Sequence, residues 1–455
     1  MPDPIKHVVL LMMENRSFDH MLGALGSVFP GLDGVDPAHP RVNLDDQGKA
    51  YPQAQTTTRQ LQFDPKHEHP DVVVQLSNQN GGFIRDFIKN YPASTEADRQ
   101  EIMGYFPIDF LPAIHSLARD FTVCDRWFSS VPGPTWPNRF FGLSGTSNGR
   151  ILMPQGFNAP DLSKYFQQTQ ETLFDRLNEA GKSWKTYYYD FPASWLLLRQ
   201  LLPQNIVHYH GIDEFFEDTR DERTFPDFVF IEPKYFGADE NDDHPPHNII
   251  KGEKLIADVY NALRSSPDLW SSTLLVLYFD EHGGMYDHVI PPSAVAPDDQ
   301  QSEYSFDQLG VRVPALLISP WVSRAVEHSQ FDHTSLLKYL TDKWNLGPLG
   351  RRTAAASSIA TAIRETSQRT DTIPFIRVSY TQLIPEHPEW EQQDHDSLHH
   401  QGMQAFAQHL GDLMDGIGAK TLQQQKPLAE RMSDIADHVK AGALLGRLDV
   451  RKIAN

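Results

Sequence analysis

The chain has little cysteine and no long hydrophobic run. Cys124 is its single cysteine, so no disulfide can form within the chain, and a small scaffold held together by disulfides is excluded. No apolar stretch approaches the ~20 residues that a helix needs to cross a bilayer. The start of the chain also lacks a signal-peptide pattern, because only a short apolar run follows Lys6 and Glu14 interrupts it. We therefore expect a protein that is cytoplasmic or secreted by a signal-less route.

Positive charge is scarce as well. The 40 lysines and arginines are outnumbered by 60 aspartates and glutamates, which gives a formal net charge of -20. Such a surface repels a phosphate backbone, so a role in binding nucleic acid has no electrostatic support. A bulk attraction to an anionic membrane is equally unsupported.

The apolar content is sufficient for a sizeable core. Of the 455 residues, 40% are hydrophobic and 22% are charged, as in soluble globular proteins. Short apolar runs alternate with helical patterns; beyond the two runs described next, strands are expected within 183–190, 225–233 and 313–322, and helices within 171–181, 252–266 and 329–344. This alternation predicts an α/β fold with a mainly parallel central sheet flanked by helices.

Two apolar runs end in pairs of oxygen-bearing side chains. Residues 7–13 and 274–279 are apolar runs, the first opening on His7, and such runs are typical of strands buried on both faces of a parallel sheet. The residues that follow them are Glu14 with Asn15 and Asp280 with Glu281. If the strands are neighbours, the four side chains meet at the carboxyl edge of the sheet, where α/β proteins bind ligands. Their oxygens suit a hard or borderline divalent cation.

Both pairs also have simpler interpretations. Asn15 could cap a helix, and the acidic pair could belong to a loop held by solvent or by arginine partners. The metal interpretation is favoured because adjacent carboxylates are costly to bury without a compensating cation. Gly283 and Gly284 then break the strand and allow a close backbone approach. Three further potential ligands follow in the same stretch: His282, Asp287 and His288.

Residues 129–147 combine prolines, glycines and hydroxyl side chains. Three prolines within six residues argue against a regular helix, so a helix is expected to begin only after Pro137. Thr135 would then lie near a helix N-terminus, which favours binding of anions such as phosphate. Spacing alone does not distinguish it from the other hydroxyls, which are Ser129, Ser130, Ser144 and Thr146.

Five motifs together resemble a bacterial phosphoesterase family that contains phospholipases C and a related acid phosphatase. In chain order, between about residues 5 and 345, they are HVVLLMMENRSFDHMLG, GGFIRDF, SSVPGPTWPNRFF, DDHPPH and FDEHGGMYDHVIPP. The resemblance implies an alkaline-phosphatase-like fold and a metal-dependent hydrolase. Composition and periodicity do not by themselves indicate this superfamily.

The resemblance also implies roles for single residues. Thr135 stands where the family has its Ser or Thr nucleophile, and His69 and His244 match active-site histidines. One divalent metal ion would be held by five residues: Glu14, Asn15, Asp280, Glu281 and Thr135. Zinc is favoured, although calcium, magnesium or manganese would also suit oxygen ligands. The implied reaction is a double displacement through a phosphothreonine, with His69 or His244 protonating the leaving alkoxide.

The sequence leaves alternatives for the histidines. His67 and His69 lie in a loop region, where surface positions are the simpler interpretation. His247 is the alternative to His244. His333 could line the site from the start of the last predicted helix, although a neighbouring residue would cap that helix in any case.

The predicted substrate is a phospholipid such as phosphatidylcholine, cleaved to diacylglycerol and a phosphorylated head group. The alternative is an acid phosphatase acting on monoesters, which needs extra cationic donors for a dianion. The cations near the motifs are few, namely Arg16, Arg126 and Arg139, whereas the aromatic residues are many: Trp127, Phe128, Trp136, Tyr286 and Trp321. Aromatic rings suit a choline cation or an interfacial lipid. We therefore expect a transient partner, a zwitterionic membrane surface, and make no prediction of the oligomeric state.

The motifs end near residue 350, where the composition changes. Residues 353–400 are rich in Thr, Ser, Gln and His, and 400–445 carry amphipathic helical patterns. We predict a metal-dependent phosphoesterase domain over residues 1–350 and a mostly helical C-terminal appendage or lid over 351–455.

Overall fold

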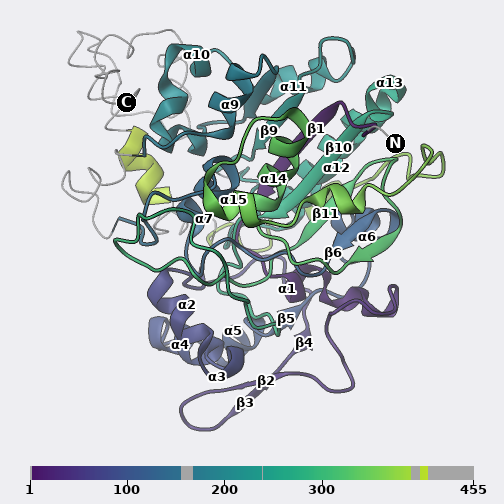
Figure 1. The fold of residues 1–455 in the computed structure, drawn as a ribbon. Helices are drawn as coiled ribbons and strands as arrows, with labels where there is room; N and C mark the ends of the chain where they lie inside the picture. Colours follow the sequence, from purple (N-terminus) through teal and green to yellow (C-terminus); the bar gives the residue numbers. More distant parts are fainter. Residues whose placement is uncertain (1–2, 155–167, 238, 391–399, 408–455) are drawn as a thin grey trace.

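A large sheet forms the centre of the protein (Figure 1). The computed structural model describes residues 3–154, 168–237, 239–390 and 400–407. The sheet has eight strands in the order β12-β6-β11-β10-β1-β9-β7-β8. Their bounds are β1 His7–Met13, β6 Thr122–Cys124, β7 Trp184–Tyr188, β8 Tyr209–Gly211, β9 Phe228–Glu232, β10 Thr273–Phe279, β11 Ala315–Ile318 and β12 Ala325–Glu327. Strand β11 runs antiparallel to both neighbours and the other pairs are parallel, so the predicted α/β class is confirmed.

The two apolar runs form adjacent strands at the centre of the sheet. Every residue of β1 and β10 is buried, as expected for strands covered on both faces. They pair in parallel, and Met13 lies opposite Phe279 at the carboxyl end. The residues that follow each strand therefore start from the same point on the edge of the sheet.

Helices flank this sheet, and a smaller group of elements extends from it (Figure 1). The main helices are α6 Ile114–Asp120, α7 Thr135–Ser144, α9 Leu173–Glu179, α11 Ile212–Asp218, α12 Ile250–Ser265 and α14 Thr334–Trp344. The smaller group includes α2 His69–Gln75, α3 Ser77–Asn80, α4 Phe83–Asn90 and α5 Glu96–Glu101, with strands β2 Val42–Leu44 and β3 Ala50–Pro52. In Figure 1 this group lies at the bottom of the molecule.

Helix α7 begins earlier than expected. Its first residue is Thr135, so the prediction of a start after Pro137 is wrong. Pro137 fits within the first turn because the N–H groups there have no partner inside the helix. The helix ends at Gly145, whose φ of 76° is left-handed. Thr135 thus occupies the N-terminus itself, where the backbone N–H groups have no partner within the helix.

The predicted division at residue 350 stays a prediction. Helix α15 spans Gly350–Ala355, and the described residues after it form 3-10 turns at Ile359–Ala362 and Tyr380–Gln382. Residues 400–407 are helical and form the yellow helix in Figure 1. The rest of the predicted helical appendage, residues 408–455, lies outside the described residues.

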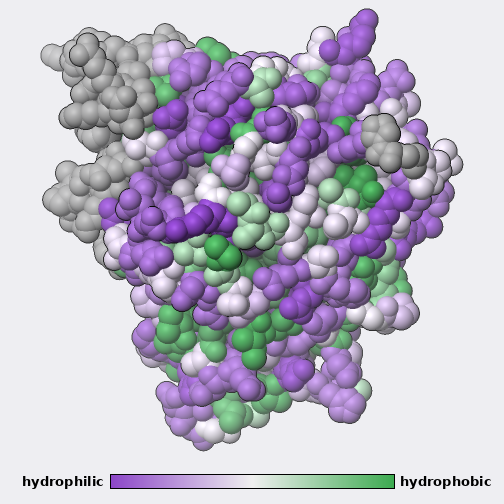
Figure 2. All heavy atoms as spheres, viewed as in Figure 1, coloured by the Kyte–Doolittle hydropathy of each residue, from purple (hydrophilic) through white to green (hydrophobic). Residues whose placement is uncertain are grey.

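The surface is mixed in character. The face in Figure 2 is mostly hydrophilic, with apolar residues gathered in its lower half, over the group of α2 to α5. Within the described part of the chain, no helix combines the length and the hydrophobicity needed to cross a membrane.

Gly283 makes the close backbone approach that the sequence predicts. Its φ is 60°, in the left-handed region, and a Cβ there would lie 2.2 Å from the backbone oxygen of Asn15. Glycine is therefore required both by the conformation and by the space. The loop after β10 is held against the end of β1 by this contact.

Gly283→Ala should lower the free energy of unfolding more than Gly181→Ala. Gly181 is also left-handed, with φ 64°, but a Cβ there would meet nothing within 4 Å. Both alanines bear the cost of a left-handed residue, about 1–2 kcal/mol, and only Gly283→Ala adds the collision with Asn15. Urea unfolding of the two variants measures the difference, and equal losses would contradict the close approach.

Candidate active site

The four oxygen-bearing residues converge at the carboxyl edge of β1 and β10. The Asp280 carboxylate oxygen Oδ1 accepts the backbone N–H of Glu281 at 2.7 Å and that of Asn15 at 3.3 Å. The Arg16 N–H donates to the backbone oxygen of Glu281 at 3.1 Å. Asn15 itself has φ 61°, a left-handed conformation that asparagine tolerates better than most residues. The structure thus brings together Glu14, Asn15, Asp280 and Glu281 as the sequence predicts.

Arg139 joins the carboxylates of the two strands. Its Nη2 donates to Glu14 Oε1 at 2.8 Å, and its Nε donates to Asp280 Oδ2 at 3.0 Å. A third bond, from Nη1, reaches the Tyr235 hydroxyl at 2.9 Å. The sequence suggested Arg139 only as one of a few nearby cations. Its spacing from Thr135 was the available signal, because residues four apart share a helix face.

That spacing places Thr135 on the same side of α7 as Arg139. The Thr135 side chain is fully buried, and its hydroxyl has no hydrogen-bond partner among the described residues. A buried hydroxyl without a partner carries a desolvation cost of about 1–3 kcal/mol. Such a cost is typical of a group that meets its partner only when a ligand or ion is bound.

Burial makes the carboxylates of this edge reluctant to ionise. Burial raises the pKa of Glu281 to about 8. It also raises the pKa of Asp280, and it raises the pKa of Glu14 well above the usual range of a glutamate. Arg139 opposes the shift at Glu14 and Asp280. At Glu281 the group that opposes the shift is His67. A cation placed there would restore the ionised form.

The donor atoms present fit a divalent metal ion. Among the five proposed ligand residues, three supply a buried oxygen that has no hydrogen-bond partner within the described chain: Asn15 Oδ1, Thr135 Oγ1 and Glu281 Oε1. Asp280 and Glu14 have carboxylate oxygens that can accept more than one bond. An all-oxygen set of this kind suits magnesium, calcium or manganese, and zinc also accepts oxygen ligands.

His67 lies in this site, and the interpretation of it as a surface-loop residue is wrong. It is 7% exposed. Its Nδ1 donates to the Pro65 carbonyl oxygen at 2.8 Å, which leaves Nε2 facing the Asn15 amide at 3.3 Å and the Glu281 carboxylate at 3.8 Å. The Asn15 amide nitrogen then faces His67, and its oxygen faces away from the ring.

The two histidines named by the family resemblance approach the site from different sides. His69 is half-buried; its Nδ1 donates to the Pro132 carbonyl oxygen at 2.6 Å, two residues before Pro134. The ring of His244 is fully buried and lies 6.0 Å from that of His67. His247, the alternative to His244, pairs with Glu240 at 2.6 Å.

His333 contacts the backbone of Asp280. Its Nδ1 accepts the indole N–H of Trp127 at 3.2 Å, so its Nε2 carries the proton that is donated to the Asp280 carbonyl oxygen at 2.7 Å. Burial lowers the pKa of His333 to about 4, which keeps it neutral. The helix it precedes begins at Thr334, whose N–H is accepted by the Asp332 side chain at 3.1 Å. His333 is therefore a positioning residue for Asp280.

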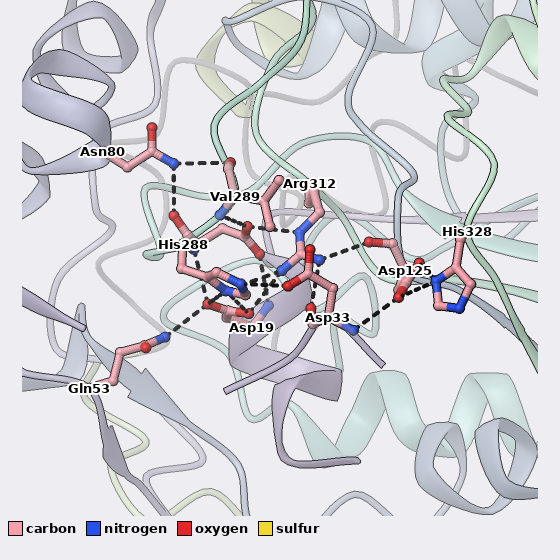
Figure 3. A network of polar contacts seen from close by, with 10 residues as sticks. Asp19, Asp33, Gln53, Asn80, Asp125, His288, Val289, Arg312 and His328 are labelled. Carbon is pink, nitrogen blue, oxygen red and sulfur yellow. Dashed lines mark hydrogen bonds and ion pairs between the residues drawn. The ribbon is translucent and has the colours of Figure 1, made fainter. Parts of the chain in front are cut away.

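Of the three further potential ligands, His282 contacts this edge and the other two do not contribute to it. The His282 Nδ1 lies 3.3 Å from Glu281 Oε2, and its Nε2 contacts the Gln75 side-chain oxygen at 2.7 Å. Asp287 and His288 belong to a separate polar network with Asp19, shown in Figure 3. One ligand atom from each of Asp19, Asp287 and His288 lies within 4.8 Å of the others, as in a possible metal site.

A built-in cation already neutralises that network. Arg312 is fully buried and donates to Asp287 Oδ1 at 2.9 Å and to Asp19 Oδ1 at 3.0 Å (Figure 3). His288 bonds Asp19 Oδ2 at 2.8 Å and Asp33 Oδ1 at 2.9 Å. With two cationic groups among its carboxylates, the network needs no metal ion and holds the loop after β10 in place.

A second group that could hold a metal lies beside His244. Ligand atoms of Glu240, Asp242 and His400 lie within 4.8 Å of one another, and all three side chains are buried. The ring of His400 is 5.2 Å from that of His244. The backbone oxygen of Asp242 accepts the N–H of Glu14 at 2.8 Å, so this group adjoins the end of β1.

His288 should make stability depend on pH above neutrality. Although burial lowers its pKa, the hydrogen bonds to Asp19 and Asp33 raise the pKa of His288 to about 10. The folded protein thus holds this proton more tightly than the unfolded chain, so the stabilisation is complete below pH ~6.5 and is lost as pH rises through ~10. His288→Gln should remove on the order of 2 kcal/mol at pH 6 and flatten the dependence. Urea unfolding from pH 6 to 9.5 measures both, and parallel curves for the two proteins would contradict the assignment.

Comparison with known proteins identifies the family. A model described as the Phosphoesterase family matches residues 5–347. The chain is 35% identical to non-specific phospholipase C3 of Arabidopsis thaliana over 404 residues, which cover 81% of this chain and 75% of that protein. It is 30% identical to phospholipase C B of Mycobacterium tuberculosis over 400 residues, which cover 75% of this chain and 74% of that protein.

Solved structures give a more distant likeness. The phosphonate monoester hydrolase of Agrobacterium radiobacter aligns with 80% of this chain and 79% of its own, at a TM-score of 0.36 and 11% identity. A protein of the alkaline phosphatase superfamily from Vibrio parahaemolyticus aligns with 57% of this chain and 65% of its own, at a TM-score of 0.33 and 11% identity. The family match confirms the resemblance seen in the five motifs: the chain belongs to the Phosphoesterase family and is a phosphoric ester hydrolase.

Proposed function

We propose that the protein is a metal-dependent phospholipase C whose nucleophile is Thr135. The observation that carries the proposal is the buried Thr135 hydroxyl, which lacks a hydrogen-bond partner among the described residues. It lies at the N-terminus of α7, one turn before the arginine that joins Glu14 to Asp280. A hydroxyl at a helix N-terminus beside carboxylates is suited to attack on a bound phosphate ester, with a cation between the two anions.

The proposed reaction is a double displacement. The Thr135 hydroxyl loses its proton to solvent as its oxygen forms a bond to phosphorus, and the bond from phosphorus to the glycerol oxygen breaks. Diacylglycerol leaves after a histidine donates a proton to that oxygen. Water then attacks the phosphothreonine and gives a proton back to the histidine. The phosphorylated head group is released, and the Thr135 oxygen takes up a proton from solvent, which restores the hydroxyl. A divalent ion held by Glu14, Asn15, Asp280, Glu281 and Thr135, zinc by preference, would supply Lewis-acid stabilisation of the phosphoryl oxygens and of the ionised hydroxyl.

Two histidines are proposed for the proton transfer. His69 lies against the segment that leads into α7: a Cβ atom placed on Gly133 would be 3.7 Å from the Cβ atom of His69. Its Nδ1 is held by the Pro132 carbonyl oxygen, so Nε2 is the atom that exchanges a proton. His244 is held in a similar way, by the Pro245 carbonyl oxygen on Nδ1. His67, on Asn15 and Glu281, orients two of the proposed metal ligands.

Glu281→Gln should lose the metal ion, whereas Thr135→Ala should keep most of it. The carboxylate supplies charge that an amide does not, while threonine is one neutral ligand among five. Both variants should lose catalysis, and their urea unfolding, measured on metal-free protein, should stay near that of the metal-free wild type. Elemental analysis after dialysis separates them. Full activity of metal-free wild-type protein in strong chelator would contradict the metal site, and turnover by Thr135→Ala would contradict the nucleophile.

The substrate assignment rests on the names of the relatives and on the character of the site. Those relatives are called non-specific phospholipase C or phospholipase C. A monoester carries an additional negative charge, for which cationic donors would be needed. Arg139 is the cation in direct contact with the carboxylate edge, and it is already engaged by three oxygens. We therefore propose a diester substrate, with acid phosphatase activity on monoesters as the second candidate.

A paired assay should favour the diester. Phosphatidylcholine vesicles should release diacylglycerol and phosphocholine, while p-nitrophenyl phosphate should be hydrolysed slowly from acidic to neutral pH. Both rates are measured on the same metal-loaded protein, with Thr135→Ala as the blank. Fast monoester hydrolysis without diacylglycerol would overturn the lipase assignment and leave the metal chemistry in place.

A further inference from the structure

Residues 373–390, called the strap below, run along the outside of helix α12. The Asn261 side chain exchanges two hydrogen bonds with the backbone of Ile376, each of 2.9 Å. The Asn248 side chain donates to the Gln382 carbonyl oxygen at 2.8 Å. Asn248 precedes α12 and Asn261 lies near its end, so the strap runs along the helix in the opposite direction.

The strap presents large apolar side chains to solvent. Phe375 is 57% exposed, Tyr380 is 79% exposed and Ile384 is 66% exposed. These are three of the ten large hydrophobic residues that are exposed in the described chain, and they lie within ten positions of one another. Ile376, between them, is buried, and Ile373, Val378 and Leu383 pack partly buried against the core. These four side chains anchor the strap, while Phe375, Tyr380 and Ile384 are exposed. A group of exposed apolar side chains is typical of an interaction surface.

The chemistry of the strap suits a neutral lipid surface. Residues 374–384, the part of the strap that carries the three exposed side chains, contain a single charged side chain, Arg377, on a protein with a net charge of -20. The two glutamates of the strap, Glu386 and Glu389, lie beyond this part. An apolar, nearly uncharged segment can enter the headgroup region without the desolvation cost of buried carboxylates. Phenylalanine and tyrosine rings are favoured at that depth, because tyrosine keeps its hydroxyl in water. The acidic remainder of the protein is repelled by anionic lipid and indifferent to zwitterionic lipid.

The strap is also tied to both loops that carry site histidines. The Gln382 carbonyl oxygen accepts a bond from Arg59 at 2.9 Å, and the Gln60 side-chain oxygen accepts the backbone N–H of His387 at 2.9 Å. The loop that starts there continues to His67. Asn248, on the other loop, follows His247 directly. A membrane bound by the strap is thus held beside the loops of the candidate active site.

We propose that the exposed face of the strap, formed by Phe375, Tyr380 and Ile384, docks the protein on bilayers of zwitterionic phospholipid. This inference rests on the proposed function, since it names the surface by which the phospholipase would reach its substrate. The surface itself binds lipid whether or not the chemistry takes place.

The test separates binding from turnover. Full-length protein carrying Thr135→Ala is sedimented with phosphatidylcholine vesicles, so that the lipid is not consumed. Adding Phe375→Ser, Tyr380→Ser and Ile384→Ser together should lower the vesicle partition coefficient by at least about tenfold, since each side chain loses apolar contact with lipid. The matched control is Val42→Ser with Leu44→Ser on strand β2, where the side chains are 47% and 49% exposed. The control should bind as its parent does.

Turnover supplies the second measurement. With Thr135 intact, the strap variant should hydrolyse monomeric short-chain phosphatidylcholine at the wild-type rate and long-chain vesicles more slowly. Unchanged vesicle binding by the strap variant, or an equal loss in the β2 control, would overturn the proposal. A dimer that the strap substitutions dissociate in analytical ultracentrifugation would also overturn it, because a second copy would then cover the strap. If no diacylglycerol is released by any variant, the proposed function fails while the sedimentation result stands by itself.

Discussion

The cost of burying like charges governs the active-site edge. Glu14, Asp280 and Glu281 all end up out of contact with water, and burial alone would drive each of them towards its protonated form. Arg139 pairs with the first two, whereas the cationic group beside Glu281 is His67, at 3.8 Å. The buried negative charge at this edge is therefore only partly compensated by cations of the chain itself. A divalent cation would compensate the rest, so binding of the ion and stability of the folded state are coupled.

The network around Arg312 shows the opposite solution with similar residues. Asp19 and Asp287 are as deeply buried as the site carboxylates, but Arg312 and His288 supply positive charge from within the chain. The carboxylate oxygens of Asp19 and Asp287 already form hydrogen bonds with these two partners. The difference between the two clusters is therefore the source of the cation, and of these two it is the edge of β1 and β10 that leaves oxygens for a ligand.

Much of this could be read from the sequence because it depends on local pattern. Two apolar runs of strand length, each ending in oxygen donors, are enough to predict adjacent strands and a common edge. The start of α7 was misplaced because Pro137 is tolerated in a first turn, which a count of prolines does not register. The place of His67 could not be predicted. It depends on contacts with Asn15 and Glu281, which are 52 and 214 positions away along the chain, and no local pattern records them.

Cys124 gives the chain a practical property. It lies in β6, its side chain is buried, and burial raises the pKa of its thiol well above the usual range. Neither the thiolate nor an access route for a reagent is available in the folded protein. Because the chain has no other cysteine, one introduced at an exposed position would be the sole reactive thiol. Spin labels and fluorophores can therefore be attached at chosen residues without first removing a native cysteine.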